Sequence, residues 1–336
     1  MGKIKFLLQF VIAFCVALGA YVFAYQPNQE QVQTTIISGV EQGKKQAEQL
    51  VEKKQKPESK PQKEPAVANN TGNTKPVQGK LKITLLDVNH GDSILLQDSK
   101  QNILVDVGHN KNGQLFFKKL DQRGVQKINT VIVTHHHADH MGNIMKVAGR
   151  YKVSRIYDNG LVNTGNPTSV KLHDILSKGN YKNRKLQAGD TINLGDGFWM
   201  EVLSPGDFLE DYLRKDLNNN SIVMLLHYGK FTMMFTGDIE NPTEAALAKK
   251  YGSKLKADVL KVAHHGSKTS SNYRFISKVQ PKYALISCGA FEEYHHPNKD
   301  VLGRLKHLGA EVYYTNANGD ITITTDGKSY EVKTEK

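Results

Sequence analysis

The stretch TVIVTHHHADHMGN, residues 130–143, joins an apolar run to a dense set of metal-binding side chains. The apolar run is rich in β-branched residues, as expected for a strand buried on both faces. Three histidines (135–137), Asp139 and His140 follow it directly. Imidazole and carboxylate groups are ligands for zinc, iron and manganese, and α/β folds place their sites at strand ends. The pattern therefore predicts a metal site rather than a His-rich surface loop.

The spacing within this stretch divides the ligands between two ions. His135 and His137 are two residues apart, so at an extended strand end their side chains point the same way. Asp139 and His140 follow a turn and can face a second point nearby. The stretch thus predicts half of a two-ion site, with His136 filling the position between two ligands.

Two later clusters could supply the other half. Asp238 ends FTGD (235–238) after an apolar strand, and a carboxylate can bridge two cations. The segment KVAHHGS (261–267) places His264 and His265 at the end of another buried strand. One of these histidines can bind a metal while the other meets the substrate, and the sequence leaves open which does which.

The residues before these motifs predict an exported chain. Residues 6–25 are almost continuously apolar, and about 20 such residues cross a bilayer. Lys3 and Lys5 precede them, which favours a cytoplasmic N-terminus and an extracellular domain. We expect residues 1–25 to be a transmembrane anchor, with a cleaved signal peptide as the alternative. Residues 26–79, rich in Gln, Lys, Glu and Pro, predict a disordered linker.

Residues 80–336 predict a single large α/β domain. Short apolar strands and helices follow one another in the order strands, helix, strand, and this order occurs twice. Such an order suggests two mixed sheets with helices on their outer faces. A hairpin is expected over 221–238, and helices over 114–123, 298–308 and from Asn241 to Gly252. We expect Asn241 to cap its helix, with Pro242 in the first turn and Glu244 closing a capping box.

The net charge of the chain is compatible with more than one class of binding partner. The chain carries 45 Lys and Arg against 33 Asp and Glu, a net charge of +12, of which residues 81–336 contribute +7. This excess is compatible with a polyanion such as nucleic acid or teichoic acid, and equally with an anionic membrane nearby. Cys15 and Cys288 are the two cysteines, so no disulfide can form within the domain.

Together the three clusters, in the order THHHADHMGN, FTGD, KVAHHGS, resemble the metallo-β-lactamase superfamily. Three further segments are similar to the nuclease-like C-terminal domain of ComEC-like competence proteins: LDVNHGDSILL, NNNSIVMLLHYGKFTMMFTGD and ISCGAFEEYHHP. The resemblance implies a four-layer αββα sandwich. The multi-helix channel of the ComEC-like proteins has no counterpart in this sequence, so DNA transport is not expected.

The resemblance also implies a ligand set. It places His135 and His137 on one ion, Asp139 and His140 on the other, Asp238 between them, and His265 or its neighbour His264 on the second ion. Asp87, Asp92 and Asp106 match acidic positions that support the ligands.

Three positions depart from the pattern of the family. Asn220 stands where many members place a third histidine for the first ion, and His227 is a poor substitute because it lies in mid-strand. His90 replaces a glutamine and His295 a glycine. The first ion is therefore expected to be held less completely than the second.

These features predict a di-metal phosphodiesterase. Two ions would lower the pKa of a shared water and stabilise charge at phosphorus, with Asp139 and Asp238 holding the pair. His264 and His296 would contact the phosphate or protonate the leaving oxygen. Zinc and manganese suit these ligands equally. Extracellular DNA is the first substrate expected. A cell-wall phosphodiester (teichoic acid or phosphorylcholine) is the alternative, since the motifs also resemble phosphorylcholine esterases, and a non-catalytic polymer-binding module is a third reading.

Overall fold

The computed structural model describes residues 77–179, 181–289 and 295–336. The predicted apolar segment (1–25) and all but the last three residues of the predicted linker (26–79) lie outside these ranges. In the part of the chain that is described, no helix combines the length and apolarity that a bilayer span requires.

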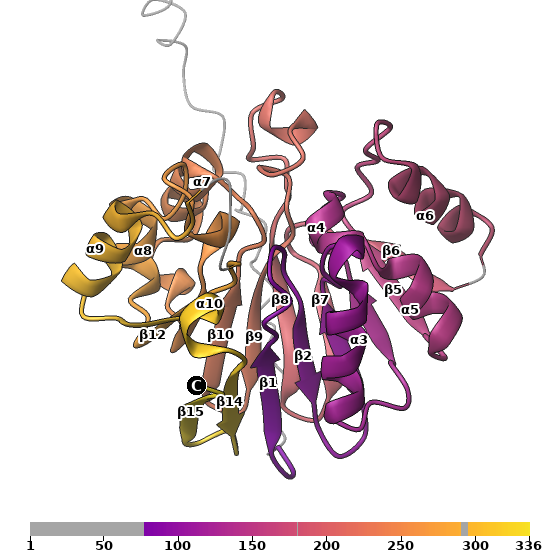
Figure 1. Cartoon of the computed structure of the whole chain (residues 1–336). Coiled ribbons are helices and arrows are strands. Elements are labelled where there is room, and N and C mark those ends of the chain that lie inside the picture. Colours follow the sequence, from indigo (N-terminus) through magenta and orange to yellow (C-terminus); the bar gives the residue numbers. More distant parts are fainter. Residues whose placement is uncertain (1–76, 180, 290–294) are drawn as a thin grey trace, which may run out of the picture. The chain divides into compact units, whose positions relative to one another are not determined.

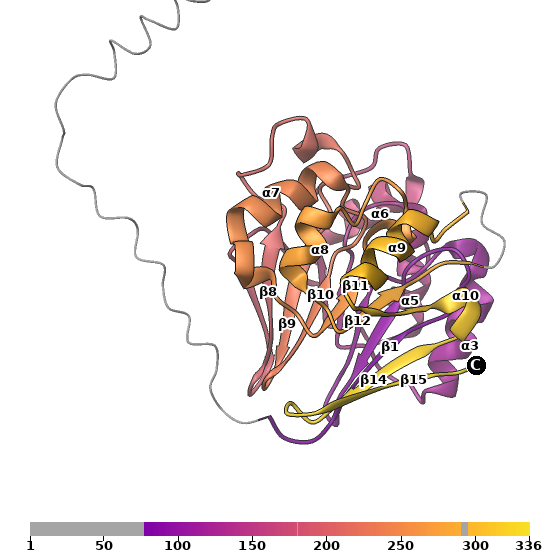
Figure 2. The same cartoon turned by 90° about the vertical axis from the view of Figure 1, so that its left-hand side faces the viewer.

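The strands of this part form two mixed sheets that pack face to face (Figures 1 and 2). The first sheet, in spatial order, contains β15 (Tyr330–Thr334), β14 (Ile321–Thr325), β1 (Leu81–Leu85), β2 (Ile94–Gln97), β3 (Asn102–Val105), β4 (Thr130–Ile132), β5 (Arg155–Asp158) and β6 (Lys182–Lys185). The second contains β13 (Glu311–Tyr314), β12 (Tyr283–Ile286), β11 (Val259–Lys261), β10 (Phe231–Phe235), β9 (Val223–Tyr228), β8 (Phe198–Ser204) and β7 (Thr191–Gly195).

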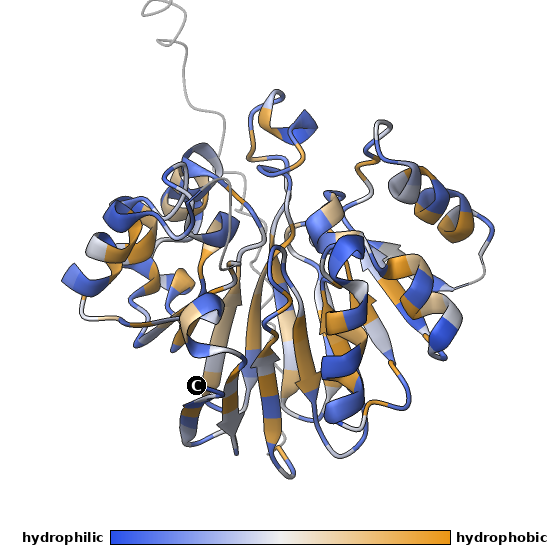
Figure 3. Cartoon of the chain, viewed as in Figure 1, coloured by the Kyte–Doolittle hydropathy of each residue, from blue (hydrophilic) through white to orange (hydrophobic). Residues whose placement is uncertain are grey.

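Helices cover the outer face of each sheet. Phe116 packs with Leu104 on the first sheet, and Leu247 packs with Leu260 on the second. Hydrophobic residues concentrate in the strands, and hydrophilic residues are frequent in the surrounding helices and loops (Figure 3). The expected αββα sandwich is therefore confirmed. The helices on the first sheet are α3 (Gly113–Gln122), α5 (Ile144–Arg150) and α6 (Pro167–Ser177), and those on the second are α7 (Asn241–Tyr251), α8 (Tyr273–Val279) and α9 (Lys299–His307).

The main core lies between the two sheets. Side chains alternate across each strand with a period of two, so one face of every strand points into this layer. Ile83 and Val105 of the first sheet share the cluster with Met224 and Phe235 of the second, and all four are buried. Truncating one such side chain to alanine costs about 2–5 kcal/mol of stability.

Parallel pairing brings the ends of several strands to one edge of the sandwich. β3, β4, β5 and β6 run parallel to one another, and so do β10, β11, β12 and β13. The chain leaves β4 just before His135, β10 just before Asp238 and β11 just before His265. The three predicted clusters therefore meet although they are far apart in sequence.

The start of α7 differs from the sequence prediction. Glu240, not Asn241, occupies the N-cap position, and its side chain makes no capping hydrogen bond. Glu244 is buried and accepts the backbone N–H groups of Ser271 (2.6 Å) and Asn272 (2.7 Å). The predicted capping box is wrong, because Glu244 anchors the turn before α8 instead of closing back on its own helix.

Candidate metal centre

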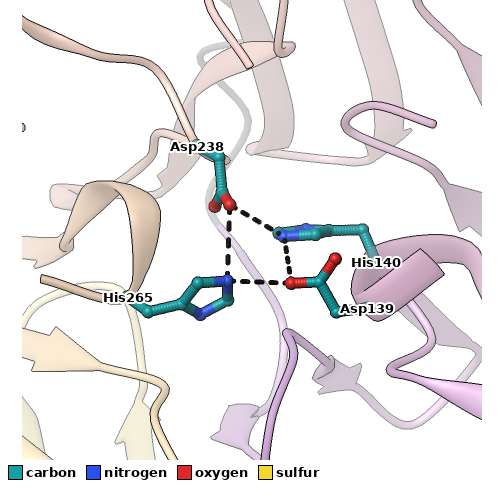
Figure 4. Close-up of side chains that lie close together, drawn as sticks. All are labelled: Asp139, His140, Asp238 and His265. Atoms are coloured by element: carbon teal, nitrogen blue, oxygen red, sulfur yellow. Dashed lines mark hydrogen bonds and ion pairs between the residues drawn. The ribbon is translucent and has the colours of Figure 1, made fainter. Parts of the chain in front are cut away.

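Four donor groups converge at the edge where the strands end (Figure 4). They belong to Asp139, His140, Asp238 and His265, and their ligand atoms lie within 4.8 Å of one another. Oδ2 of Asp238 is 3.1 Å from Nε2 of His140 and 3.3 Å from Nε2 of His265. Oδ2 of Asp139 is 3.2 Å from Nε2 of His265. Two carboxylates and two imidazoles around one point form a donor set suited to a divalent transition metal.

Hydrogen bonds behind the two imidazoles set which nitrogen faces the cluster. Nδ1 of His140 lies 2.8 Å from Oδ2 of Asp106, and Nδ1 of His265 lies 3.0 Å from the carbonyl oxygen of Ser287. Because these oxygens accept the Nδ1 proton, each ring presents the lone pair of Nε2 to the centre. Within the described residues, Oδ1 of Asp238 is buried without a hydrogen-bond partner, and the partners of Nε2 of His140 are the carboxylates of the cluster itself. The site therefore fits a cation.

The backbone separates the two adjacent histidines of the third cluster. His264 (φ 49°) and His265 (φ 52°) both adopt left-handed conformations, which cost non-glycine residues about 1–3 kcal/mol each. As a result His265 enters the four-donor cluster, while Nδ1 of His264 lies 3.2 Å from Oε1 of Glu240. Of the two ligand candidates that the sequence left open, the structure brings His265 to the centre.

The other pair of predicted ligands lies beside this centre. Nε2 of His135 is 3.0 Å from Nδ1 of His137, and the rings of His135 and His140 are 4.1 Å apart. Among the residues that the structure describes, no third His, Cys, Asp or Glu forms a compact donor group with this pair. The structure thus brings Asp139, His140, Asp238 and His265 together in one cluster of four donors, with the His135–His137 pair beside it.

A comparison with protein-family models identifies the family to which this chain belongs. The family model described as the metallo-beta-lactamase superfamily matches residues 86–290. The chain belongs to this superfamily.

Relatives within the metallo-beta-lactamase superfamily include competence proteins. ComE operon protein 3 of Bacillus subtilis is 29% identical over 259 residues, covering 71% of this chain and 32% of that protein. Competence protein ComA of Neisseria gonorrhoeae is 28% identical, covering 72% of this chain and 32% of that protein. This chain therefore spans about a third of the length of these relatives.

A solved structure agrees with the fold. The metallo-beta-lactamase fold protein YhfI of Bacillus subtilis superimposes with a TM-score of 0.51 at 16% identity, covering 74% of this chain and all of that one.

Oppositely charged neighbours shift the pKa values of the side chains in the four-donor cluster. Burial raises the pKa of Asp238, but His140 and His265 outweigh it and hold that pKa well below its usual value. Burial lowers the pKa of His140, but Asp238, Asp139 and Asp106 raise it well above the ordinary value for histidine. Burial, with His140 nearby, keeps the pKa of His135 well below the usual value. His135 is therefore a neutral imidazole, the form that binds metal, whereas binding at the four-donor cluster requires proton release.

A buried ion pair supports His265 from behind. Nζ of Lys261 lies 2.7 Å from Oδ2 of Asp92, and both side chains are almost fully buried. Oδ1 of Asp92 lies 3.4 Å from Nδ1 of His265. Lys261 ends β11 and Asp92 belongs to the loop between β1 and β2, so the pair also ties the two sheets together beside the centre. The supporting role that the resemblance implied for Asp92 and Asp106 agrees with these contacts.

Asp87 makes different contacts. Its carboxylate accepts the N–H of Asn89 and lies 4.0 Å from Nζ of Lys336. Neither contact is with a ligand, so the supporting role of Asp87 stays a prediction.

Two residues that the sequence did not assign to the site border the centre. Nε2 of His90 lies 3.3 Å from Oδ2 of Asp139, and its ring is 5.5 Å from that of His265. The neighbouring Gly91 (φ 116°) packs so tightly that a Cβ would lie 2.3 Å from the carbonyl oxygen of Asp139. Only glycine therefore allows His90 to approach the cluster this closely. The His-Gly-Asp run was visible in the sequence, but this proximity was not.

The other residues considered from the sequence, His296, Asn220 and His227, do not belong to the four-donor cluster. The ring of His296 lies 6.0 Å from that of His264 and 6.2 Å from that of His265. Asn220 is buried, and its carbonyl oxygen accepts a hydrogen bond from Asn159. His227 stacks on Trp199 at 3.9 Å within the second sheet, where burial lowers its pKa to about 4. His227 is thus remote from the metal centre in role as well as in position.

His136 is not a spare position. It is fully buried, with Nδ1 2.7 Å from Oγ of Ser169 and Nε2 3.2 Å from Oδ2 of Asp158. These contacts tie the metal-binding loop to α6 and to the end of β5. His136 therefore stabilises the loop that carries the ligands rather than binding a metal.

Replacing His136 with alanine is expected to separate stability from metal binding. The change leaves the buried Asp158 carboxylate short of a partner, which costs about 1–3 kcal/mol of unfolding free energy. Denaturant unfolding and metal analysis of the purified protein measure the two effects. The control is His173→Ala, since His173 is exposed on α6, the helix that His136 contacts through Ser169. Loss of a metal ion without loss of stability would assign His136 to the ligands instead.

Proposed function

We propose that this chain is an exported two-metal phosphodiesterase that cleaves DNA. The observation that carries the proposal is the convergence of Asp139, His140, Asp238 and His265, with both imidazole Nε2 atoms aimed at one point. In the proposed site these four residues hold one ion. His135 and His137 would hold the second ion, and Asp238 would contribute its carboxylate to both.

The ions, when bound, supply a water of lowered pKa and neutralise charge that develops on the phosphate oxygens. The protein's own residues orient and confine this chemistry. Asp106 and Ser287 fix the two imidazoles, and the buried Lys261–Asp92 pair prevents His265 from turning away. Such outer contacts set the ligand geometry, and losing one lowers metal affinity by about 10–100-fold.

His264 is the proposed proton carrier. Its Nδ1 faces Glu240, and Glu240 also accepts a 2.9 Å hydrogen bond from Oγ1 of Thr269. With Nδ1 donating to the carboxylate, Nε2 of His264 can take up a proton from the attacking water, and the resulting imidazolium can then give that proton to the leaving oxygen. The side chain is partly exposed, as a group that meets substrate must be. His296, on the other side of His264, is the proposed contact for the phosphate.

The choice of DNA and of export rests on other observations. The relatives are a competence operon protein, a competence protein and, in Haemophilus influenzae, a recombination protein. The +7 charge of residues 81–336 favours a polyanionic substrate. The apolar run 6–25 behind Lys3 and Lys5 supports a membrane anchor with the catalytic domain outside the cell.

One experiment separates the proposed activity from its alternatives. The full-length protein, stripped of metal, is incubated with single-stranded DNA, double-stranded DNA, RNA or poly(glycerol phosphate), each with zinc or manganese, and the products are resolved directly. We expect DNA cleavage that depends on added metal. Cleavage of poly(glycerol phosphate) alone would favour the cell-wall esterase. Binding of DNA without cleavage under every metal would make the domain a binding module.

A further inference from the structure

A cavity of about 600 Å³ lies along α7, the helix that begins three residues after Asp238. Pro242, Ala245 and Ala246 form its floor, at the i, i+3 and i+4 spacing that places residues on one side of a helix. The loop that contains Phe208 and Tyr212 forms one wall. We call this feature the α7 groove. Its volume falls within the range of about 300–1,000 Å³ typical of ligand sites.

Basic side chains also line the α7 groove. Lys249 and Lys250 of α7 and Arg274 of α8 line it, against one carboxylate, Glu210, among the described lining residues. Lys249 and Arg274 are exposed, and neither makes an ion pair with another described residue. The groove therefore carries a net positive charge that is available to an anionic ligand.

Aromatic side chains complete the groove. Tyr212 is 61% exposed, the most exposed large hydrophobic side chain of the described residues. Phe208 lies under the ammonium of Lys250, with Nζ 4.5 Å from the ring centre. Unpaired bases stack on aromatic rings while their phosphates pair with neighbouring cations, and this combination is typical of single-strand binding sites. A double strand hides the faces of its bases, so the groove favours a single strand.

The groove begins beside the proposed catalytic residues. Oδ1 of Asn219 accepts hydrogen bonds from the N–H of Glu240 (3.2 Å) and from Oγ1 of Thr243 (3.0 Å). These bonds fasten the loop with the aromatic wall to the start of α7. Glu240 is the partner of His264. From Pro242 to Lys249 the groove then runs about 10 Å away from the centre, at 1.5 Å per helical residue.

We propose that the α7 groove binds the single-stranded DNA that leads into the metal centre. This proposal rests on the phosphodiesterase function proposed above. Lys249 and Arg274 pair with phosphates, Tyr212 stacks on a base, and the strand passes Pro242 to reach His264. The negative charge of Glu210 repels the phosphates of the DNA, so removing that charge strengthens binding.

Three variants of the full-length protein test the groove: Lys249→Ala/Arg274→Ala, Tyr212→Ala and Glu210→Gln. Binding is measured with a fluorescent 20-nucleotide single strand over a series of salt concentrations. We expect the double variant to bind at least about tenfold more weakly and to lower the salt slope by about 1.4, at about 0.7 per phosphate contact. Tyr212→Ala is expected to weaken binding about tenfold with little change in slope. Glu210→Gln is expected to bind more tightly.

Cleavage assays separate the groove from the metal centre. Hydrolysis of a small phosphodiester, bis(p-nitrophenyl) phosphate, is expected to be unchanged in all three variants, while kcat/KM for the oligonucleotide falls with affinity. The control, Lys118→Ala/Lys146→Ala, removes two exposed lysines from a second cavity, beside α3 and α5. It is expected to behave like the unmodified protein.

Several outcomes would overturn the groove proposal. The proposal is wrong if the groove variants bind the oligonucleotide as tightly as Lys118→Ala/Lys146→Ala does while they still hydrolyse bis(p-nitrophenyl) phosphate. The metal centre would then be active, and the groove would have no part in binding DNA. It is also wrong if poly(glycerol phosphate) binds as tightly as DNA and Tyr212→Ala weakens neither, since the groove then recognises phosphate without bases. If the unmodified protein hydrolyses neither phosphodiester, the proposed function is wrong, and the binding measurements still decide the groove.

Discussion

Asp238→Asn is expected to remove one metal ion and to lower phosphodiesterase kcat/KM by at least about a thousandfold, or about 4 kcal/mol of transition-state stabilisation. Asp238 lies against both imidazoles of the four-donor cluster, and it is the residue proposed to be shared by both ions. An asparagine keeps the size of the side chain but loses the negative charge that neutralises two cations. The fold is expected to survive, because the change leaves the volume almost unchanged.

Metal content by mass spectrometry and turnover of a single-stranded oligonucleotide measure the two effects of Asp238→Asn. The control is Asp258→Asn, which alters a carboxylate at the other end of β11. Asp258 accepts hydrogen bonds from the backbone and hydroxyl of Thr232. That variant is expected to lose some stability and keep its metal. Two bound ions and near-normal turnover in Asp238→Asn would remove Asp238 from the centre.

Lys261→Met is expected to destabilise the folded protein by about 3–5 kcal/mol, because it leaves the Asp92 carboxylate buried without its cation. The same change releases the support behind His265, so metal affinity is expected to fall about 10–100-fold in the fraction that folds. Adding Asp92→Asn to Lys261→Met removes the stranded charge. The double variant is therefore expected to recover much of the stability but not the metal affinity.

Denaturant unfolding and metal titration of the single and double variants form a double-mutant cycle for this pair. Lys333→Met is the matched control, because Lys333 pairs with Glu331 on the surface, where such a pair contributes about 0–1 kcal/mol. Equal stability losses for Lys261→Met and Lys333→Met would show that the buried pair has no special role. Full recovery of metal affinity in the double variant would contradict the supporting role of Asp92.

Local sequence patterns were sufficient to predict much of the fold. The apolar β-branched runs before His135 and His265 form buried strands, and the hairpin around Tyr228 turns where expected. Less regular elements were missed. β6 reads KNRK and β5 begins with Arg155, so neither shows an apolar pattern, and both are strands because the sheet supplies their hydrogen bonds. β13 and α8 were likewise not predicted.

The helix-start motif at Asn241 shows why local signals mislead. Glu244 stands three residues after Asn241, as a capping box requires, but the backbone N–H groups of Ser271 and Asn272 compete for its carboxylate. Those groups lie nearly 30 residues further along the chain, and only the tertiary fold brings them to Glu244. A spacing rule cannot include such a competitor.

The candidate site shows the same division between local and long-range information. The types and order of the side chains were sufficient to predict Asp139, His140 and Asp238 as ligands. Each of them follows a strand, and the ends of these strands meet at one edge of the fold. The choice between His264 and His265 could not be made, because it depends on two left-handed residues in succession. The Lys261–Asp92 pair joins segments from different sheets, and the contact of His90 with Asp139 joins two segments of the first sheet that are almost 50 residues apart; no pattern along the chain predicts either contact.

The most direct test of the central claim is anomalous diffraction from crystals of the protein loaded with zinc or manganese, recorded at the absorption edge of the metal. The proposed two-metal site predicts a peak bound by Asp139, Asp238 and Nε2 of both His140 and His265, with a second peak beside His135 and His137. Peaks elsewhere, or a metal bound through Nδ1 of either His140 or His265, would contradict it.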